Sequence, residues 1–89
     1  MVARVATFNT LADDINPDAV ARLRKTVRGT PGFIAGYHLG GPGRKSVSIA
    51  IFDDADAGKA AHAALDRLPA DQRVRATPDS VEFFEVESF

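Results

Sequence analysis

The sequence predicts a single α+β domain over residues 1–89, in which two helices alternate with four strands in the order βαββαβ. A Thr-Pro-Gly-Phe turn at 30–33 separates a helical pattern from a strand-like one. The apolar run at 46–52 ends in Asp53 and Asp54, which precede an alanine-rich helical segment. Helices that cover only one face of a sheet leave the second face to be buried by something else. The sequence therefore also predicts a homodimer.

Composition excludes several functional classes. The chain has 11 Lys and Arg against 12 Asp and Glu, so no overall field favours nucleic acid or an anionic membrane. It has no cysteine, which excludes a disulfide framework and a thiolate zinc site. It lacks a signal-peptide pattern and any apolar run long enough to span a membrane. These features predict a cytoplasmic protein with a small, neutral partner molecule, without nucleic-acid or membrane binding.

The first half of the chain is predicted to form a strand, a helix and a second strand. Residues 2–10 alternate with enough β-branched and aromatic side chains for a strand. Asn16 followed by Pro17 is typical of a helix start, and this helix is expected to run to about Arg28. A second strand is predicted over 33–39. The helix's apolar face recurs at helical spacing and consists of Val20, Leu23 and Val27.

The second half is also predicted to form a strand, a helix and a strand. A glycine-rich turn at 40–43 leads to a central strand over 45–52, which has no conspicuously polar face. A helix follows over 55–68 and stops at Pro69, and the last strand is predicted over 81–89. The side chains on the inner face of that helix are mostly small, so the helix can lie close to the sheet. These residues are Ala57, Ala61, Ala64, Leu65 and Leu68.

Three segments together resemble the antibiotic biosynthesis monooxygenase-like (ABM) domains: the Pro-Gly-Phe turn, the Phe-Asp-Asp junction at 52–54, and the Val-Glu-Phe-Phe-Glu-Val ending at 81–86. The resemblance covers nearly the whole chain. It implies a ferredoxin-like four-stranded antiparallel sheet whose subunits pair as a dimeric α/β barrel. The family includes cofactor-independent oxygenases of aromatic polyketides, quinol-forming oxygenases, haem-degrading enzymes and many proteins of unassigned function.

The chain departs from the family's catalytic patterns. Phe52 stands where polyketide-type members carry Trp, and Ser48 stands where they carry Asn. Asn9 matches an Asn of the haem-degrading members, which also require a Trp that this chain lacks. Two functions stay open: a small-molecule-binding protein of unassigned activity, or a cofactor-independent monooxygenase acting on a phenolic, quinol or aromatic polyketide-like substrate. The ligand is expected to be a small aromatic or quinone-like molecule.

Three residues are candidates for catalysis. Tyr37 and His38 are neighbours on one strand and point to opposite faces, so only one of them belongs to the site. A Tyr phenol would hold a ligand oxygen, whereas a His would take a phenol proton as a general base. Asn9, at the end of the first strand, is the third candidate. The residues expected to line the pocket are Phe8, Phe52 and His62.

No cofactor and no metal site is predicted. The glycine-rich turn at 40–43 precedes a strand, unlike a phosphate-binding loop, which precedes a helix. The aspartates near the two helix starts lack the spacing of a calcium loop and suit helix capping or loop solvation; they are Asp13, Asp14, Asp53, Asp54 and Asp56. The basic residues of the first helix have no interleaved aromatic side chains and indicate a solvated helix face; they are Arg22, Arg24, Lys25 and Arg28.

Overall fold

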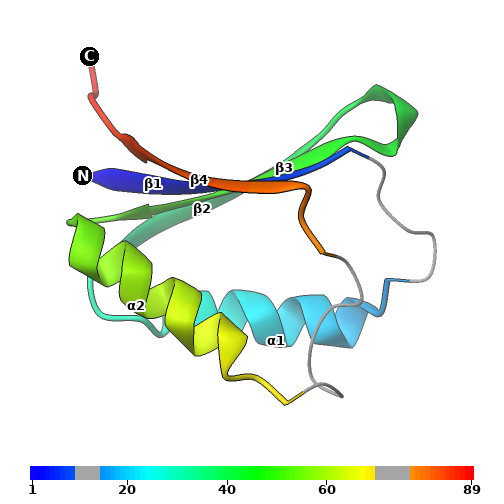
Figure 1. The fold of residues 1–89 in the computed structure, drawn as a ribbon, viewed down its shortest axis with the longest axis horizontal. Helices are drawn as coiled ribbons and strands as arrows, with labels where there is room; N and C mark the ends of the chain where they lie inside the picture. The colour runs from blue at the N-terminus through cyan, green and yellow to red at the C-terminus, as the bar shows by residue number, and fades with distance from the viewer. Residues whose placement is uncertain (10–14, 70–76) are drawn as a thin grey trace.

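The computed structural model describes residues 1–9, 15–69 and 77–89, which form a sheet covered by two helices (Figure 1). The predicted order βαββαβ is confirmed. Thr10, the predicted end of the first strand, lies outside the described residues. The second helix and the last strand end earlier than predicted. The elements are β1 (Val2–Phe8), α1 (Pro17–Arg28), β2 (Phe33–Gly40), a 3₁₀ turn (Pro42–Arg44), β3 (Ser46–Phe52), α2 (Ala55–Asp66) and β4 (Ser80–Glu85).

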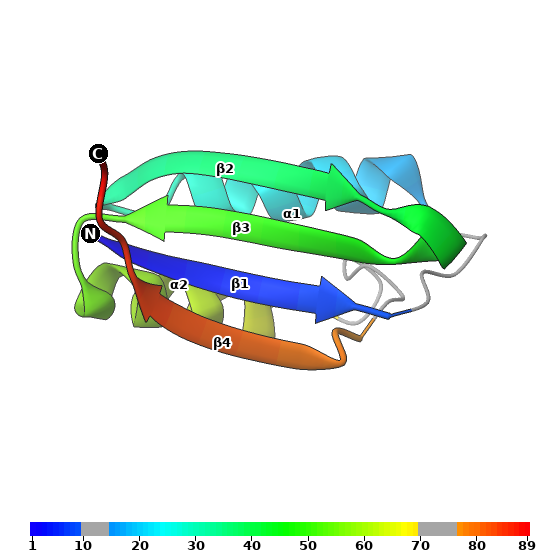
Figure 2. The same cartoon turned by 90° about the horizontal axis from the view of Figure 1, so that it is seen from above.

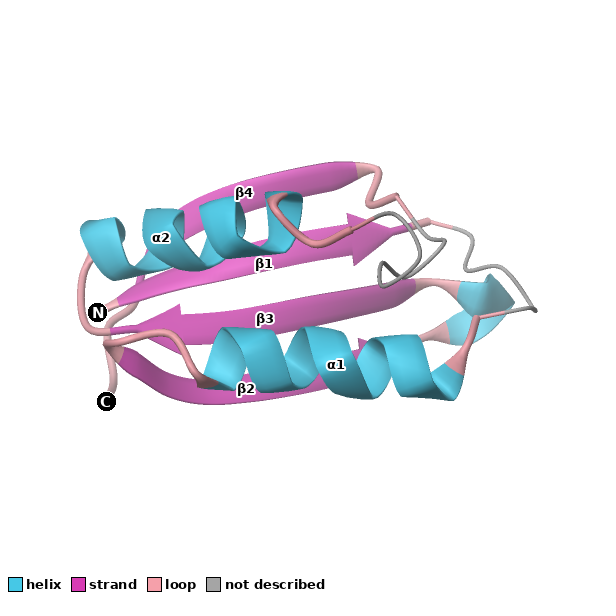
Figure 3. Ribbon diagram, turned by 90° about the horizontal axis from the view of Figure 1, so that it is seen from below, coloured by secondary structure: helices cyan, strands magenta, loops and turns pink. Residues whose placement is uncertain are grey.

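The four strands form an antiparallel sheet in the order β2-β3-β1-β4 (Figure 2). Both helices lie against the same face and run along the strands, α1 over β2 and β3 and α2 over β4 and β1 (Figure 3). This is the predicted ferredoxin-like arrangement. We call the helix-covered side the inner face and the opposite side the outer face, which no described element covers.

Both helices begin where side-chain caps satisfy free backbone N–H groups. The Asn16 side chain accepts a hydrogen bond from the Asp18 N–H at 2.9 Å, and Pro17 occupies the first helical position. The Asp54 carboxylate likewise accepts from the Ala57 N–H at 2.8 Å. Neither helix, nor any other helix of the described residues, is long and apolar enough to cross a membrane.

Bulky side chains of the inner face gather at one end of the sheet. Phe52 is fully buried, and the ring of Phe33 meets it edge-on at 5.9 Å between centroids. A Cβ on Gly58 would lie 3.6 Å from the Phe52 ring, so α2 packs closely over this end. Towards the other end, most inner-face side chains apart from Phe8 are small, which leaves space beneath the helices; the small residues are Ala6, Gly36, Ser46, Ser48 and Ala50.

The outer face carries many of the sheet's bulky apolar side chains. Tyr37, Leu39 and Phe84 are 58%, 52% and 49% exposed there. Strand register places them with the central residues Val5, Val47, Ile49 and Ile51. An apolar sheet face of this kind is characteristic of an interaction surface.

A β-bulge in β2 changes which residues share a face. Simple alternation along 33–39 would place Phe33 on the same face as Tyr37, with His38 on the opposite face. The pairing of β2 with β3 instead shifts register between Phe33 and Ala35. Phe33 therefore shares the inner face with Gly36 and His38, and Tyr37 lies on the outer face.

Candidate functional site

Two cavities of about 350 Å³ and about 510 Å³ lie between the sheet and the helices. Volumes of this size accommodate small organic ligands. Four residues line both cavities, namely Arg4, Arg24, His38 and Ser48, and we call them the polar junction. The wall of the larger cavity is otherwise mostly apolar and includes Ala6, Phe8, Ile15, Val20, Leu23, Leu65, Leu68, Pro78 and Val81.

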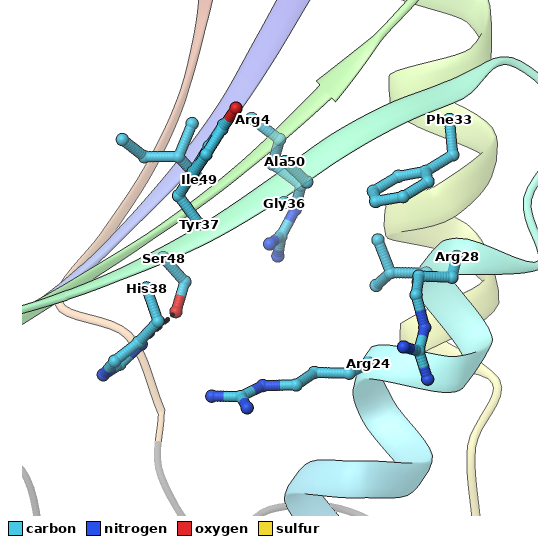
Figure 4. Close-up of a pocket in the computed structure, with 11 residues that line it drawn as sticks. Arg4, Arg24, Arg28, Phe33, Gly36, Tyr37, His38, Ser48, Ile49 and Ala50 are labelled. Carbon is cyan, nitrogen blue, oxygen red and sulfur yellow. Dashed lines mark hydrogen bonds between the residues drawn. The ribbon is translucent and has the colours of Figure 1, made fainter.

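The β2–β3 pairing builds one side of the polar junction. His38 is the register partner of Ser48, and the His38 Nδ1 lies 3.0 Å from the Ser48 Oγ. This hydrogen bond orients the imidazole on the floor of the cavities. From α1, the Arg24 side chain extends into the same space, while Tyr37 and Ile49 point away from it (Figure 4). The junction thus combines a titratable imidazole with a guanidinium on the facing helix.

Arg4 anchors the other side of the junction from the middle of β1. Its Nε donates to the His62 Nδ1 at 3.2 Å, and the His62 Nε2 lies 3.6 Å from the Asp66 Oδ2 one helical turn further on. A neutral His62 that accepts at Nδ1 carries its proton on Nε2, facing the Asp66 carboxylate. Arg4 is thereby held in place by α2.

Burial alters the chemistry of Arg4. Desolvation lowers the pKa of its guanidinium below the ordinary arginine value, and the nearby Asp66 carboxylate partly opposes that shift. The direction means that the charged form is less well solvated in the folded chain than in water. Partial desolvation of a cation on a cavity floor strengthens its electrostatic attraction for an electron-rich oxygen.

The three candidate catalytic residues lie in different places. His38 belongs to the polar junction. Tyr37 borders the smaller cavity, but its side chain points to the outer face and is 58% exposed. Asn9 is exposed, lies outside both cavity linings, and its backbone N–H donates to the Asp79 carboxylate at 2.6 Å. His38 is therefore the one with its side chain among the cavity's polar groups.

Of the three residues expected to line the pocket, two line a cavity and one does not. Phe8 and His62 line the larger cavity, and the His62 ring meets that of Phe83 at 6.3 Å. Phe52 lies in the core and lines neither cavity. Ser48, which stands where the family resemblance implies Asn, lines both cavities.

Sequence reasoning missed the arginines. Arg24 and Arg28 are exposed, as expected of a solvated helix face, yet both line the smaller cavity. Arg4 was not a candidate, although a cation within an apolar strand is a signal that could have identified it. Ser46 was also missed: it is 3% exposed, lines the larger cavity, and its hydroxyl has no hydrogen-bond partner among the described residues.

The described residues contain no group of three His, Asp or Glu side chains arranged to hold a metal ion. The site that they do form consists of an apolar chamber with cationic and hydrogen-bonding groups at one side.

Comparison with known proteins identifies the fold. Neither a protein-family model nor a curated protein matches the sequence. Among solved structures, an Asn-to-Ala variant of SnoaB, a cofactor-independent oxygenase from Streptomyces nogalater, has a TM-score of 0.74 at 24% identity, covering 99% of this chain and 94% of that one. The chain has the ABM-like fold.

Two further structures support the ABM-like fold. A protein described as an antibiotic biosynthesis monooxygenase has a TM-score of 0.56 at 19% identity, covering 99% of this chain and all of that one. Rv0793 from Mycobacterium tuberculosis has a TM-score of 0.57 at 17% identity, covering 99% and 96% of the two chains. Likeness at these identities establishes architecture, whereas function depends on the residues of the site.

Proposed function

We propose that this chain is a small-molecule-binding protein that takes an aromatic or quinone-like ligand between its sheet and helices, and that it acts as a homodimer. The observation that carries this proposal is the apolar chamber of about 510 Å³ that ends at the polar junction. Apolar walls with a few convergent polar groups are typical of ligand sites. An aromatic ring suits the walls, and the junction supplies hydrogen-bond donors for a ring oxygen.

Filling the chamber is expected to abolish ligand binding. Ala6 is 3% exposed and lines the larger cavity, so Ala6→Phe would place a ring where the ligand's ring is expected. Binding of 2-naphthol, followed by its fluorescence, should weaken by about 10-fold or more. Ala60→Phe is the matched control, because Ala60 is exposed on α2. Equal affinities for the two variants, both folded by circular dichroism, would contradict the proposed location.

The outer face supports the homodimer. Its exposed aromatic and aliphatic side chains form a sheet-wide apolar surface over β2, β3, β1 and β4. Two copies that pack these faces together would form the dimeric α/β barrel that the family resemblance implies, and the contact would be the same on both subunits. The added burial would also support a domain whose own core is small.

Cofactor-independent oxygenation is a second candidate, favoured by His38 within the polar junction. His38 would take the proton of a phenol whose ring bears an activated methylene. The resulting carbanion would give its electrons to O₂, forming a carbon–oxygen bond and, with the returned proton, a hydroperoxide. Loss of water then leaves a carbonyl, so CH₂ and O₂ become C=O and H₂O. The similarity to the fold of SnoaB, a cofactor-independent oxygenase, supports testing this reaction.

Oxygen uptake with dithranol, a phenolic anthrone, tests the second candidate. If the chain is an oxygenase, uptake should exceed the buffer blank and fall by about 100-fold in His38→Gln, as expected for loss of a general base. Asn9→Ala should retain the wild-type rate, because Asn9 lies outside both cavity linings. Uptake no faster than the blank would eliminate oxygenation of this substrate while leaving ligand binding in place.

A further inference from the structure

We propose that the ligand of this site is an aromatic acid, and that its carboxylate binds between Arg4 and Arg24 at the polar junction. This inference rests on the proposed function and specifies the ligand's chemical class. Arg4 rises from β1 and Arg24 extends from α1, so the two guanidiniums approach the junction from opposite walls (Figure 4). The planar fork of a guanidinium matches a carboxylate in geometry and charge.

The charge of the site is the first support. Of the described residues, three that line the two cavities carry guanidiniums, namely Arg4, Arg24 and Arg28, and one, Asp66, carries a carboxylate. The whole chain carries a formal net charge of -1, so this positive excess is local to the site. A cleft lined by one sign of charge attracts ligands of the opposite sign.

The second support is the position of Arg24. Arg24 and Arg28 are four residues apart on α1, so their like charges repel on one face of the helix. Arg28 lies in the last turn, where the helix dipole favours a cation, but Arg24 lies further from that end. Neither has an ion-pair partner among the described residues. A bound anion would offset the repulsion between them and the desolvation of Arg4.

Ser46 gives an independent indication that a polar ligand enters the larger cavity. Its side chain is almost fully buried, and its Oγ has no hydrogen-bond partner in the described part of the chain. Buried hydroxyls are normally paired, because leaving one unpaired is costly. Ser46 lies two residues from Ser48 on the same face of β3, within the chamber that the ring would occupy.

The test compares 2-naphthoate with its uncharged isostere, naphthalene-2-carboxamide, by isothermal titration calorimetry on the purified protein at neutral pH. We expect the carboxylate to bind about 10-fold more tightly, as hydrogen bonds to a charged group allow. The preference should shrink as sodium chloride is added. In Arg24→Gln it should fall to about 2-fold. The matched control is Arg22→Gln, because Arg22 is exposed on α1 and lines neither cavity.

Each other outcome overturns the inference in a different way. Equal binding of carboxylate and amide overturns the aromatic-acid assignment and leaves the proposed ligand site standing. A carboxylate preference that survives both Arg24→Gln and Arg4→Gln, with both variants folded, overturns the assignment of these two residues. Failure of both compounds to bind overturns the inference together with the proposed function.

Discussion

Replacing Ile49 by aspartate is expected to convert a dimer into monomers. Ile49 lies at the centre of β3 on the outer face, between Val5 of β1 and Tyr37 of β2. In a symmetric dimer the substitution would bury two unpaired carboxylates near the middle of the contact. Because burying an unpaired charge costs several kcal/mol, the dissociation constant should rise by about 1,000-fold or more. Sedimentation velocity across a protein dilution series measures this change directly.

A matched control separates loss of the interface from general destabilisation. Ala60→Asp introduces the same side chain at an exposed position of α2, away from the outer face. It should leave both the dissociation constant and the thermal midpoint near their wild-type values. If Ile49→Asp also sediments as a dimer with wild-type affinity, the outer face is not the interface.

The variant Arg4→Met is expected to lose most affinity for an aromatic carboxylate while keeping or gaining stability. Desolvation lowers the pKa of Arg4, so the charged guanidinium opposes folding. That cost is present at every pH below the folded-state pKa of Arg4, and is relieved only as the pH rises through that pKa. Over the usable pH range, relief of this desolvation should offset the lost contact with His62, so the free energy of unfolding should stay within about 1 kcal/mol of the wild-type value.

Two measurements on one preparation check the Arg4→Met prediction. Urea denaturation gives the free energy of unfolding, and calorimetry with 2-naphthoate should show affinity reduced by about 10-fold or more, as expected for a charged hydrogen-bonding partner. Arg22→Met is the control, since it removes an exposed arginine from outside the cavities. A stability loss exceeding about 2 kcal/mol would mean that the contacts of Arg4 with His62 and Asp66 outweigh its desolvation.

Much of the fold follows from local sequence signals. Asn16-Pro17 and Asp54 begin the two helices because each supplies a side-chain oxygen to a free N–H. The central position of β3 was also expected, since both of its faces lack conspicuous polarity. Simple alternation along β2 does not give the face of Phe33. One extra residue between Phe33 and Ala35 moves Phe33 to the face opposite Tyr37. Such a bulge depends on tertiary pairing with β3 rather than on a local residue signal.

The site is less accessible to sequence reasoning than the fold. That Tyr37 and His38 point to opposite faces follows from strand geometry, but which face the helices cover does not. The cavity itself results from small residues on three strands, including Ala6, Gly36 and Ser46, which come together only in the sheet. In the sequence, Arg24 is indistinguishable from an ordinary solvated helix cation. Only the position of α1 over the inner face of the sheet shows that Arg24 lines the cavities.

The most direct test of the ligand site is backbone amide mapping by NMR during titration with 2-naphthol. We expect the largest chemical-shift changes at the inner-face positions Ala6, His38, Ser46 and Ser48, and in the α1 turn that carries Arg24. Outer-face positions such as Ile49 and Leu39 should change little. Changes confined to the outer face, or none at saturating ligand, would contradict the claim that this chain binds an aromatic molecule between its sheet and helices.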